Sequence, residues 1–386
     1  MSFPTAFCSW QDPRGDGDRE ERAAIDRVIA SGRFTMAGEV EAFESELAAW
    51  HGRAHAIMVN SGSSANLVAV AALANRDGGW RRFDGLREGF VAPAVAWATT
   101  YAPPIQYGLI PALIDVDDTW NSPADLVDRA RWRNPPRLLV AVPVLGNAAH
   151  IYGWQVLASK LRISLLVDAC ESIGAHMPEG RQSSVAIFGD LATLSFFHSH
   201  QLSAIEGGAI LTDDHELARL CRLLRNHGNA GWGSENFETS YNFEVFGYNV
   251  RPLEMHAAIA REQLRKLPDM IRARQLNLAH FRDETHNLPI IHQRLTGIPS
   301  PFGLSFAVES PTTRRHLVAA LRAASIDARL PTGGSFSKHP YGTPWAEYNP
   351  TPNADRIHDT GLFLGNAPYP IPDLVERAVK VMKETL

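Results

Sequence analysis

The chain has 386 residues, a formal net charge of −5 at pH 7, 45% apolar and 20% charged residues, which suits a globular enzyme with one large and one smaller domain. The acidic balance and the lack of a basic stretch argue against nucleic-acid binding, and no apolar run is long enough to cross a bilayer. Three scattered cysteines fit neither a disulfide framework nor a metal site, and the N-terminus lacks the pattern of a secretory signal, so we expect a cytoplasmic protein without a bound metal.

Short apolar runs alternate with helical patterns in the first part of the chain. HAIMVN (55–60) predicts a strand, and the apolar spacing of SSANLVAVAALANR (63–76) predicts a helix directly after it. Further strands are expected at GFVAPA, LIPALIDVD, RLLVAVPVL, RISLLVDA and DLATLSFF, because each is short and rich in the residues of strands covered on both faces. The alternation predicts a mostly parallel sheet with helices on both sides.

The later part of the chain has a different pattern. RPLEMHAAIAREQLRKL (251–267) predicts a long helix, and from about Pro301 a strand (FGLSFAVE) is followed by a helix (TTRRHLVAALRAASI). We therefore predict an α/β protein with a large domain over residues 1–255 and a smaller C-terminal α/β domain over residues 256–386.

SGSSAN (61–66) lies between the first strand and its helix. Small residues let the backbone approach an anion, and the unpaired N–H groups at the start of a helix favour negative charge. Ser63 and Ser64 would add hydroxyl donors. Serine and glycine also cap helices without any ligand, so both a phosphate site and a simple cap remain open from this motif alone.

Three other residues occupy places where an α/β enzyme could contact a ligand. Asp168 ends an apolar strand, at the sheet edge where ligands gather; it could pair with a charged ring nitrogen of a cofactor or cap a helix. Trp97 could stack on a flat ring or belong to the core. Asn249, in FGYNVRPLE, could contact a ligand or cap the next helix.

The order of these motifs resembles that of the DegT/DnrJ/EryC1/StrS family, the nucleotide-sugar aminotransferases and dehydratases among the fold-type I pyridoxal phosphate enzymes. The resemblance runs from about residue 20 to the C-terminus. It implies an aspartate-aminotransferase-like fold, pyridoxal 5′-phosphate (PLP) or pyridoxamine 5′-phosphate (PMP) as cofactor, a nucleotide-sugar substrate and a homodimer.

The resemblance implies that four residues bind the cofactor phosphate. Ser63, Ser64 and Ser195 would contact the phosphate within one subunit. Asn249 would reach the phosphate of the cofactor in the partner subunit, which is why the resemblance implies a dimer.

It also implies three contacts with the cofactor ring. Asp168 would hold the pyridinium nitrogen, and Trp97 would cover the ring. Glu171 stands where relatives typically have a Gln or Asp near the cofactor hydroxyl.

One position departs from the aminotransferases. Their cofactor-binding lysine lies six residues before the Glu of an EGG motif, and here that position is His200, six residues before Glu206. No lysine occurs between Lys160 and Lys266. Without this amine the cofactor cannot be bonded to the protein there, although phosphate, ring and nitrogen contacts can still hold it.

Histidine at this position resembles the PMP-dependent 3-dehydratases of 4-keto-6-deoxy sugars, as do the segments VLGNAAH and IDARLPTGGSFSKHPYG. One type of these enzymes carries an iron–sulfur cluster on four cysteines, which three cysteines cannot supply. The chain resembles the cluster-free type, which includes GDP-4-keto-6-deoxymannose 3-dehydratase. Departures from its pattern at Ala148, Lys338 and Trp97 leave the sugar and the nucleotide open.

The resemblance implies a reaction in which the C3 hydroxyl of a nucleotide-linked 4-keto-6-deoxy sugar is removed. His200 would take and return a proton, as an imidazole with a pKa near 6.5 can do, and glutamate would regenerate PMP. Three alternatives stay open: an aminotransferase or lyase for another keto substrate, a non-catalytic PLP-binding protein, and a His200 that is only a polar loop residue. His198 and His227 have no assigned role.

Overall fold

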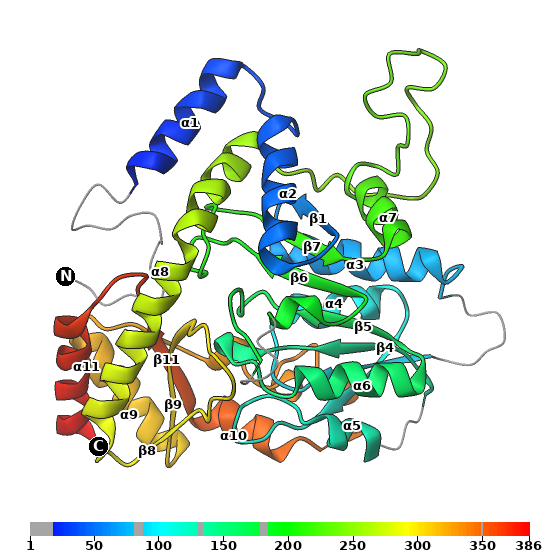
Figure 1. Cartoon of the computed structure of the whole chain (residues 1–386). Coiled ribbons are helices and arrows are strands. Elements are labelled where there is room, and N and C mark those ends of the chain that lie inside the picture. The colour runs from blue at the N-terminus through cyan, green and yellow to red at the C-terminus, as the bar shows by residue number, and fades with distance from the viewer. Residues whose placement is uncertain (1–17, 81–87, 130–133, 178–183, 349) are drawn as a thin grey trace.

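A seven-stranded sheet forms the centre of the larger part of the molecule. The computed structural model describes residues 18–80, 88–129, 134–177, 184–348 and 350–386 (Figure 1). The strands lie in the order β1 (His55–Val59), β7 (Gly208–Thr212), β6 (Leu191–Ser195), β5 (Ser164–Asp168), β4 (Pro136–Ala141), β2 (Gly89–Pro93) and β3 (Ile110–Ile114). Strand β7 is antiparallel to both neighbours, and the other six strands run in one direction. The predicted mostly parallel sheet is confirmed.

Helices cover both faces of this sheet. One face packs against α3 (Gly62–Arg76), α4 (Ala98–Gln106) and α7 (His215–Arg225), and the other against α2 (Gly38–His51), α5 (Ala124–Arg129), α6 (Ile151–Leu161) and part of α8 (Glu254–Thr285). Along β4, Leu138 and Val140 enter the first core, and Leu139 and Ala141 enter the second. The strands are apolar throughout because their alternating side chains meet two buried faces.

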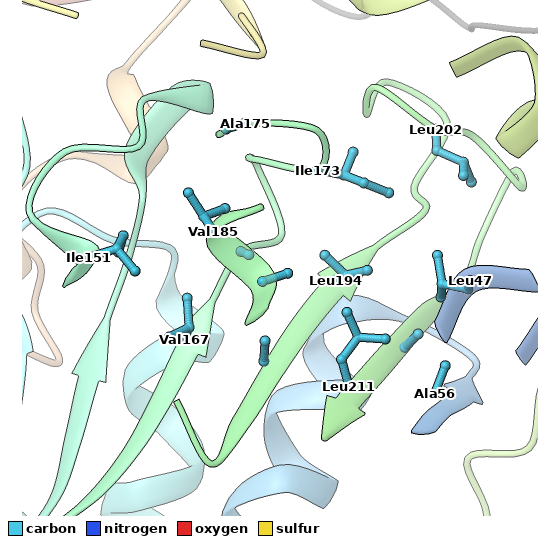
Figure 2. Close-up of a cluster of buried hydrophobic side chains, with 14 of the residues drawn as sticks. Leu47, Ala56, Ile151, Val167, Ile173, Ala175, Val185, Leu194, Leu202 and Leu211 are labelled. Carbon is cyan, nitrogen blue, oxygen red and sulfur yellow. The ribbon is translucent and has the colours of Figure 1, made fainter. Parts of the chain in front are cut away.

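Figure 2 shows part of the second core. Leu47 of α2, Leu194 of β6 and Leu211 of β7 lie together between the sheet and its helices, and all three are fully buried. Burying a leucine side chain stabilises the fold by about 1.5–3 kcal/mol. This packing holds β6 and β7 in place, and the loop between these two strands contains His200.

The C-terminal part forms a second, antiparallel sheet. Its strands lie in the order β10 (Ala328–Arg329), β11 (Gly361–Gly365), β9 (Gly303–Val308) and β8 (Ile290–His292), and its helices are α9 (Pro311–Ala323), α10 (Pro352–Thr360) and α11 (Pro372–Thr385). The strand and the helix predicted after Pro301 are β9 and α9. A smaller C-terminal α/β unit is therefore confirmed as part of the fold.

Helix α8 joins the two parts of the molecule. It contacts α1 (Arg19–Ser31) and α2 on one side and α11 on the other (Figure 1). The predicted boundary between residues 255 and 256 lies in its first turn, so this division of the chain stays a prediction. None of the described helices, α8 included, is long and apolar enough to cross a membrane.

The parallel strands bring the predicted site residues to one edge of the sheet. Strands β1, β2, β5 and β6 all end there, since parallel strands share the edge at which their carboxyl ends lie. Ser63, Trp97, Asp168 and His200 lie on or after these strand ends. The fold therefore gathers residues that are more than 100 positions apart in the sequence.

The placement of β7 in the core can be tested by a cavity. Replacing the fully buried Leu211 by alanine should lower the free energy of unfolding by about 2–5 kcal/mol, because the surrounding side chains fill the space only in part. The control Leu276→Ala removes a side chain that is 59% exposed on α8, and we expect a change within about 0.5 kcal/mol. Urea unfolding followed by tryptophan fluorescence measures both; equal losses would contradict the described core.

Candidate active site

A cavity of about 290 Å³ opens at the carboxyl edge of the large sheet. Loops after β1, β2, β5 and β6 line it on one side, and residues of the C-terminal part line it on the other. Six of the eight predicted site residues are among its lining residues: Ser63, Trp97, Asp168, Glu171, Ser195 and His200. Ser64 and Asn249 are not.

The first turn of α3 forms the base of the cavity. Ser61 caps this helix: its hydroxyl accepts a hydrogen bond from the Ser64 backbone N–H at 3.1 Å and donates one to the Ser64 hydroxyl at 3.0 Å. Gly62 and Ser63 line the cavity in front of the cap. The positive end of the helix dipole therefore faces the cavity, and the cap and the anion-binding arrangement occur together rather than as alternatives.

Two glycines let three backbone segments approach one another here. A Cβ atom on Gly62 would lie 2.6 Å from the Cβ of Ser195, and a Cβ atom on Gly208 would lie 2.4 Å from the carbonyl carbon of Ser61. Both distances are shorter than van der Waals contact. Glycine at these positions therefore allows β6, β7 and the start of α3 to bring Ser195 beside the helix N-terminus.

Asp168 is held by a buried hydrogen-bond network. It is 4% exposed, and its Oδ2 accepts hydrogen bonds from Asn66 Nδ2 at 2.8 Å and from Thr100 Oγ1 at 2.6 Å. Asn66 is held in turn by the Thr193 hydroxyl, which donates to its Oδ1 at 2.7 Å. A buried carboxylate is costly without such partners, so the network fixes this acceptor in the cavity.

Glu171 lies across the cavity from α3, in the loop after β5. Its Oε2 accepts hydrogen bonds from the Leu145 backbone N–H at 3.0 Å and from Thr332 Oγ1 at 2.9 Å. Burial raises the pKa of Glu171 to about 7, the nearby Asp168 acts in the same direction, and the two hydrogen bonds oppose the increase. This carboxyl group therefore exchanges its proton near neutral pH.

His200 lies in the β6–β7 loop with its ring edge against the ring of Phe302, 5.0 Å between centroids. Burial is the largest cause that lowers its pKa to about 4, and the Arg274 guanidinium adds to the decrease. Its Nδ1 is buried and has no hydrogen-bond partner in the described part of the chain. At neutral pH the imidazole is thus uncharged, a correction to the pKa near 6.5 used in the sequence analysis.

Two side chains fix the backbone around His200. The fully buried Gln201 donates hydrogen bonds from Nε2 to the carbonyl oxygens of Glu171 at 2.6 Å and of Ser300 at 2.8 Å. The fully buried Arg274 of α8 donates to the carbonyl of Phe302 at 3.3 Å and reaches that of His200 at 3.5 Å. The position of the imidazole thus depends on both parts of the molecule.

Trp97 stands at the open side of the cavity. Its side chain is 57% exposed, so the core alternative considered for this residue is wrong. Gly333 lies next to its ring, since a Cβ atom there would come within 3.5 Å of the indole. The exposed ring is available to cover a flat ligand in the cavity.

Asn249 and two histidines lie apart from this arrangement. Asn249 is exposed, and α8 begins only at Glu254 with Leu253 as its N-cap, so the helix-cap alternative for Asn249 is wrong. Its contact with the cofactor of a partner subunit stays a prediction. His227 shares a hydrogen bond of 2.8 Å with Arg251 Nη1, and His198 packs edge-on against Phe197.

The residues of the cavity fit PLP. They offer a helix N-terminus with hydroxyl groups for a phosphate, a fixed carboxylate for a ring N–H, and an exposed indole for a ring face. No lysine is among the lining residues, and the buried, unpaired Nδ1 of His200 is an atom for which a ligand could supply the missing partner.

Several residues of the site had no signal in the sequence. Asn66 lies in the SGSSAN motif, so its side chain could have been considered with the serines, and Thr100 follows Trp97 by three positions. Phe302, Arg329 and Thr332 also line the cavity. They come from the C-terminal part, and only the packing of the two sheets places them there.

Comparisons with known proteins agree with this site. Residues 16–383 match the DegT/DnrJ/EryC1/StrS aminotransferase family. The chain is 34% identical to the GDP-4-keto-6-deoxy-D-mannose 3-dehydratase of Yersinia pseudotuberculosis, over 100% of this chain and 99% of that protein.

Two solved structures are similar over nearly their whole length. The E. coli GDP-4-keto-6-deoxy-D-mannose-3-dehydratase with bound hydrated PLP has a TM-score of 0.85 and 33% identity, and covers 99% of each chain. A GDP-4-keto-6-deoxymannose-3-dehydratase with a trapped PLP-glutamate geminal diamine has the same TM-score and identity, over 98% of this chain and 100% of that one. The predicted fold type and the PLP/PMP cofactor are thereby confirmed.

The close approach at Gly62 predicts a cofactor-binding defect. In Gly62→Ala, the new methyl group would press on Ser195 and on Cys170 Sγ, 3.0 Å away; overpacking of this kind costs roughly 1–3 kcal/mol. If the strain falls on the cofactor-binding state, the dissociation constant of PLP rises by about 5- to 150-fold. Absorbance titration with PLP measures this constant.

Gly38→Ala is the matched control, because a Cβ atom at Gly38 meets nothing within 4 Å. We expect this variant to bind PLP as the unmodified protein does. Unchanged PLP affinity in Gly62→Ala would show that the contact between α3 and β6 does not shape the phosphate site.

Proposed function

Because the chain belongs to the DegT/DnrJ/EryC1/StrS aminotransferase family, we propose that this PLP-dependent enzyme is a sugar 3-dehydratase. It removes the C3 hydroxyl of a nucleotide-linked 4-keto-6-deoxy sugar and works with PMP. The observation that carries this proposal is His200: an uncharged imidazole borders the cavity, and no lysine lines it.

The residues described above would hold the cofactor without a covalent bond. The first turn of α3, with Ser63 and Ser195, binds the phosphate; Asp168 accepts a hydrogen bond from the ring nitrogen, and Trp97 covers one ring face. Ser64 supports this site through the Ser61 cap. When bound, the cofactor supplies an amine that condenses with the C4 ketone and a protonated ring that withdraws electrons from the reacting carbons.

His200 acts as the general base. A base must be unprotonated before it acts, and a pKa of about 4 keeps the imidazole uncharged at neutral pH. Its ring is held edge-on by Phe302 and its backbone by Gln201 and Arg274. This support keeps the proton-accepting nitrogen in one place, as proton transfer requires.

Replacement of a lysine by this histidine separates dehydration from amination. An amine in the cavity would capture the aldehyde form of the cofactor, whereas an imidazole cannot form a stable imine. We take glutamate as the amino donor that restores PMP, since a similar dehydratase has been trapped with PLP and glutamate. Arg329, which lines the cavity, offers a positive charge to a carboxylate or a diphosphate.

We also propose that the chain acts as a homodimer in which Asn249 reaches the partner's cofactor. The segment between α7 and α8 stands away from the rest of the molecule (Figure 1). Several of its aromatic side chains are largely exposed: Phe237 is 84%, Tyr241 78% and Phe246 99% exposed. Exposed apolar groups gathered in one segment are typical of a protein–protein contact.

Product analysis distinguishes this proposal from its alternatives. The protein is incubated with PMP and a panel of GDP-, CDP-, dTDP- and UDP-linked 4-keto-6-deoxy sugars. A 3-deoxy ketone with release of ammonia supports the dehydratase; an amino sugar identifies an aminotransferase, and tight PLP binding without turnover identifies a non-catalytic binding protein. Which nucleotide is accepted follows from the same panel.

His200→Asn should lower the rate of dehydration by roughly 10²–10⁴-fold, the usual value of a positioned base. The affinity for PMP should stay the same, because the amide fills most of the space of the ring. Single-turnover kinetics and PMP titration measure the two quantities. A variant that keeps the full rate would contradict the role of His200.

His200→Lys should instead bind PLP covalently, because it returns an amine to the place where aminotransferases of this family have theirs. Borohydride reduction followed by intact mass spectrometry detects the bond as an added mass, and dehydration should be lost. His200→Asn is the control, since it should give no added mass.

A further inference from the structure

Loss of the C3 hydroxyl as water requires an acid as well as a base. The uncharged His200 is suited to accept a proton, but it carries none to donate before it has acted. The cavity contains another group that could supply a proton to the leaving oxygen. This inference rests on the dehydratase proposal and concerns the residue that performs the second proton transfer.

The hydrogen bonds of Glu171 make its two carboxyl oxygens different. Both donors, the Leu145 N–H and the Thr332 hydroxyl, converge on Oε2, and in the described part of the chain no hydrogen bond reaches Oε1. A protonated carboxyl group has one oxygen that accepts and one that carries the proton. The geometry thus matches a neutral acid with Oε2 as acceptor and Oε1 as the O–H group.

Both donors are held by unusual backbone conformations. Leu145, in η1 (Val144–Gly146), has φ +54°, and Thr332, in η3 (Pro331–Gly333), has φ +45°. Non-glycine residues rarely adopt positive φ, and β-branched residues such as threonine least of all. Two such turns meet at the same carboxyl oxygen, which is typical of a functional site that the surrounding packing maintains.

The charged surroundings of Glu171 favour its neutral form. Burial is the main cause that raises its pKa to about 7, and Asp168 adds to it. The titratable or charged side chains that line the same cavity are Asp168, Cys170, His200, Glu206 and Arg329. His200 is uncharged at neutral pH, so the charge balance near Glu171 is set mainly by Asp168, Glu206 and Arg329.

We propose that Glu171 is the general acid of the dehydration and delivers the proton on Oε1 to the C3 hydroxyl of the sugar. As the C3–O bond breaks, its electron pair leaves with the oxygen, and the added proton makes the leaving group water. His200 accepts the proton that is lost from the reacting carbon framework. One proton is given and one is taken, and exchange with solvent restores both residues, so no oxidant or reductant is needed.

The protonation of Glu171 can be measured without any turnover. Infrared difference spectra of the protein, recorded without and with PLP between pH 5 and pH 9, should contain the carbonyl stretch of a protonated carboxyl group that disappears as the pH rises through about 7. This band should be missing in Glu171→Gln. It should remain in Glu309→Gln, which changes an exposed carboxyl group far along the chain.

Kinetics test the role of the proton. Glutamine keeps an oxygen for the Leu145 and Thr332 donors but cannot transfer a proton, so Glu171→Gln should lower the rate of dehydration by roughly 10²–10⁴-fold with unchanged PMP affinity. The unmodified enzyme should lose activity as the pH rises through about 7, because Glu171 loses its proton there, and the remaining activity of Glu171→Gln should lack this alkaline limb.

The two proposals fail in different ways. If no sugar of the panel is dehydrated, the proposed function is wrong, whereas the infrared band still reports whether Glu171 carries a proton. If dehydration occurs but the band is missing at pH 6, or Glu171→Gln keeps the alkaline limb, the acid is another group and the inference is overturned.

Discussion

The hydrogen bonds that hold the Asp168 carboxylate are the interaction on which the site depends. They join the end of β5 to α3 through Asn66 and to α4 through Thr100, and Thr193 of β6 holds Asn66. A carboxylate at this depth is stable only if its oxygens are paired. The network therefore fixes the start of α3, the Trp97 loop and the end of β6 relative to one another, and the other cofactor contacts follow from that.

Around this fixed acceptor, two environments push two proton-transfer groups in opposite directions. Burial makes His200 a weaker base than a free imidazole and makes Glu171 a weaker acid than a free carboxyl. Both groups are thus uncharged near neutral pH, one ready to accept and the other ready to donate. Paired groups with separated pKa values are a common arrangement for acid–base catalysis, and they also let a largely buried cavity keep few net charges.

Much of the large sheet could be predicted from the sequence, because buried parallel strands need continuous apolar runs. The sheet then determines where Ser63, Asp168 and Ser195 lie, since parallel strands place their following residues at one edge. Their contacts with the cofactor, and that of Asn249, stay predictions. Trp97 could not be assigned from its neighbours: whether an aromatic residue after a strand is exposed depends on the C-terminal part, where Gly333 meets its ring.

Other features depended on contacts that no local pattern contains. The partners of Glu171 come from two turns with positive φ that are 187 positions apart, at Leu145 and Thr332. The low pKa of His200 follows from its burial beneath Phe302 and its distance from any carboxylate partner, not from its loop sequence. The sequence alone indicated the replacement of lysine by histidine, and only the packing of the two sheets indicated how the imidazole is held.

The electron density of the protein crystallised with PLP tests the central claim most directly. We expect the phosphate at the first turn of α3, the ring beneath Trp97 with its nitrogen at Asp168, and the His200 imidazole facing the ring, with no bond between the cofactor and the protein. Continuous density from the cofactor to any of the five lysines, or a His200 side chain turned out of the cavity, would contradict the account.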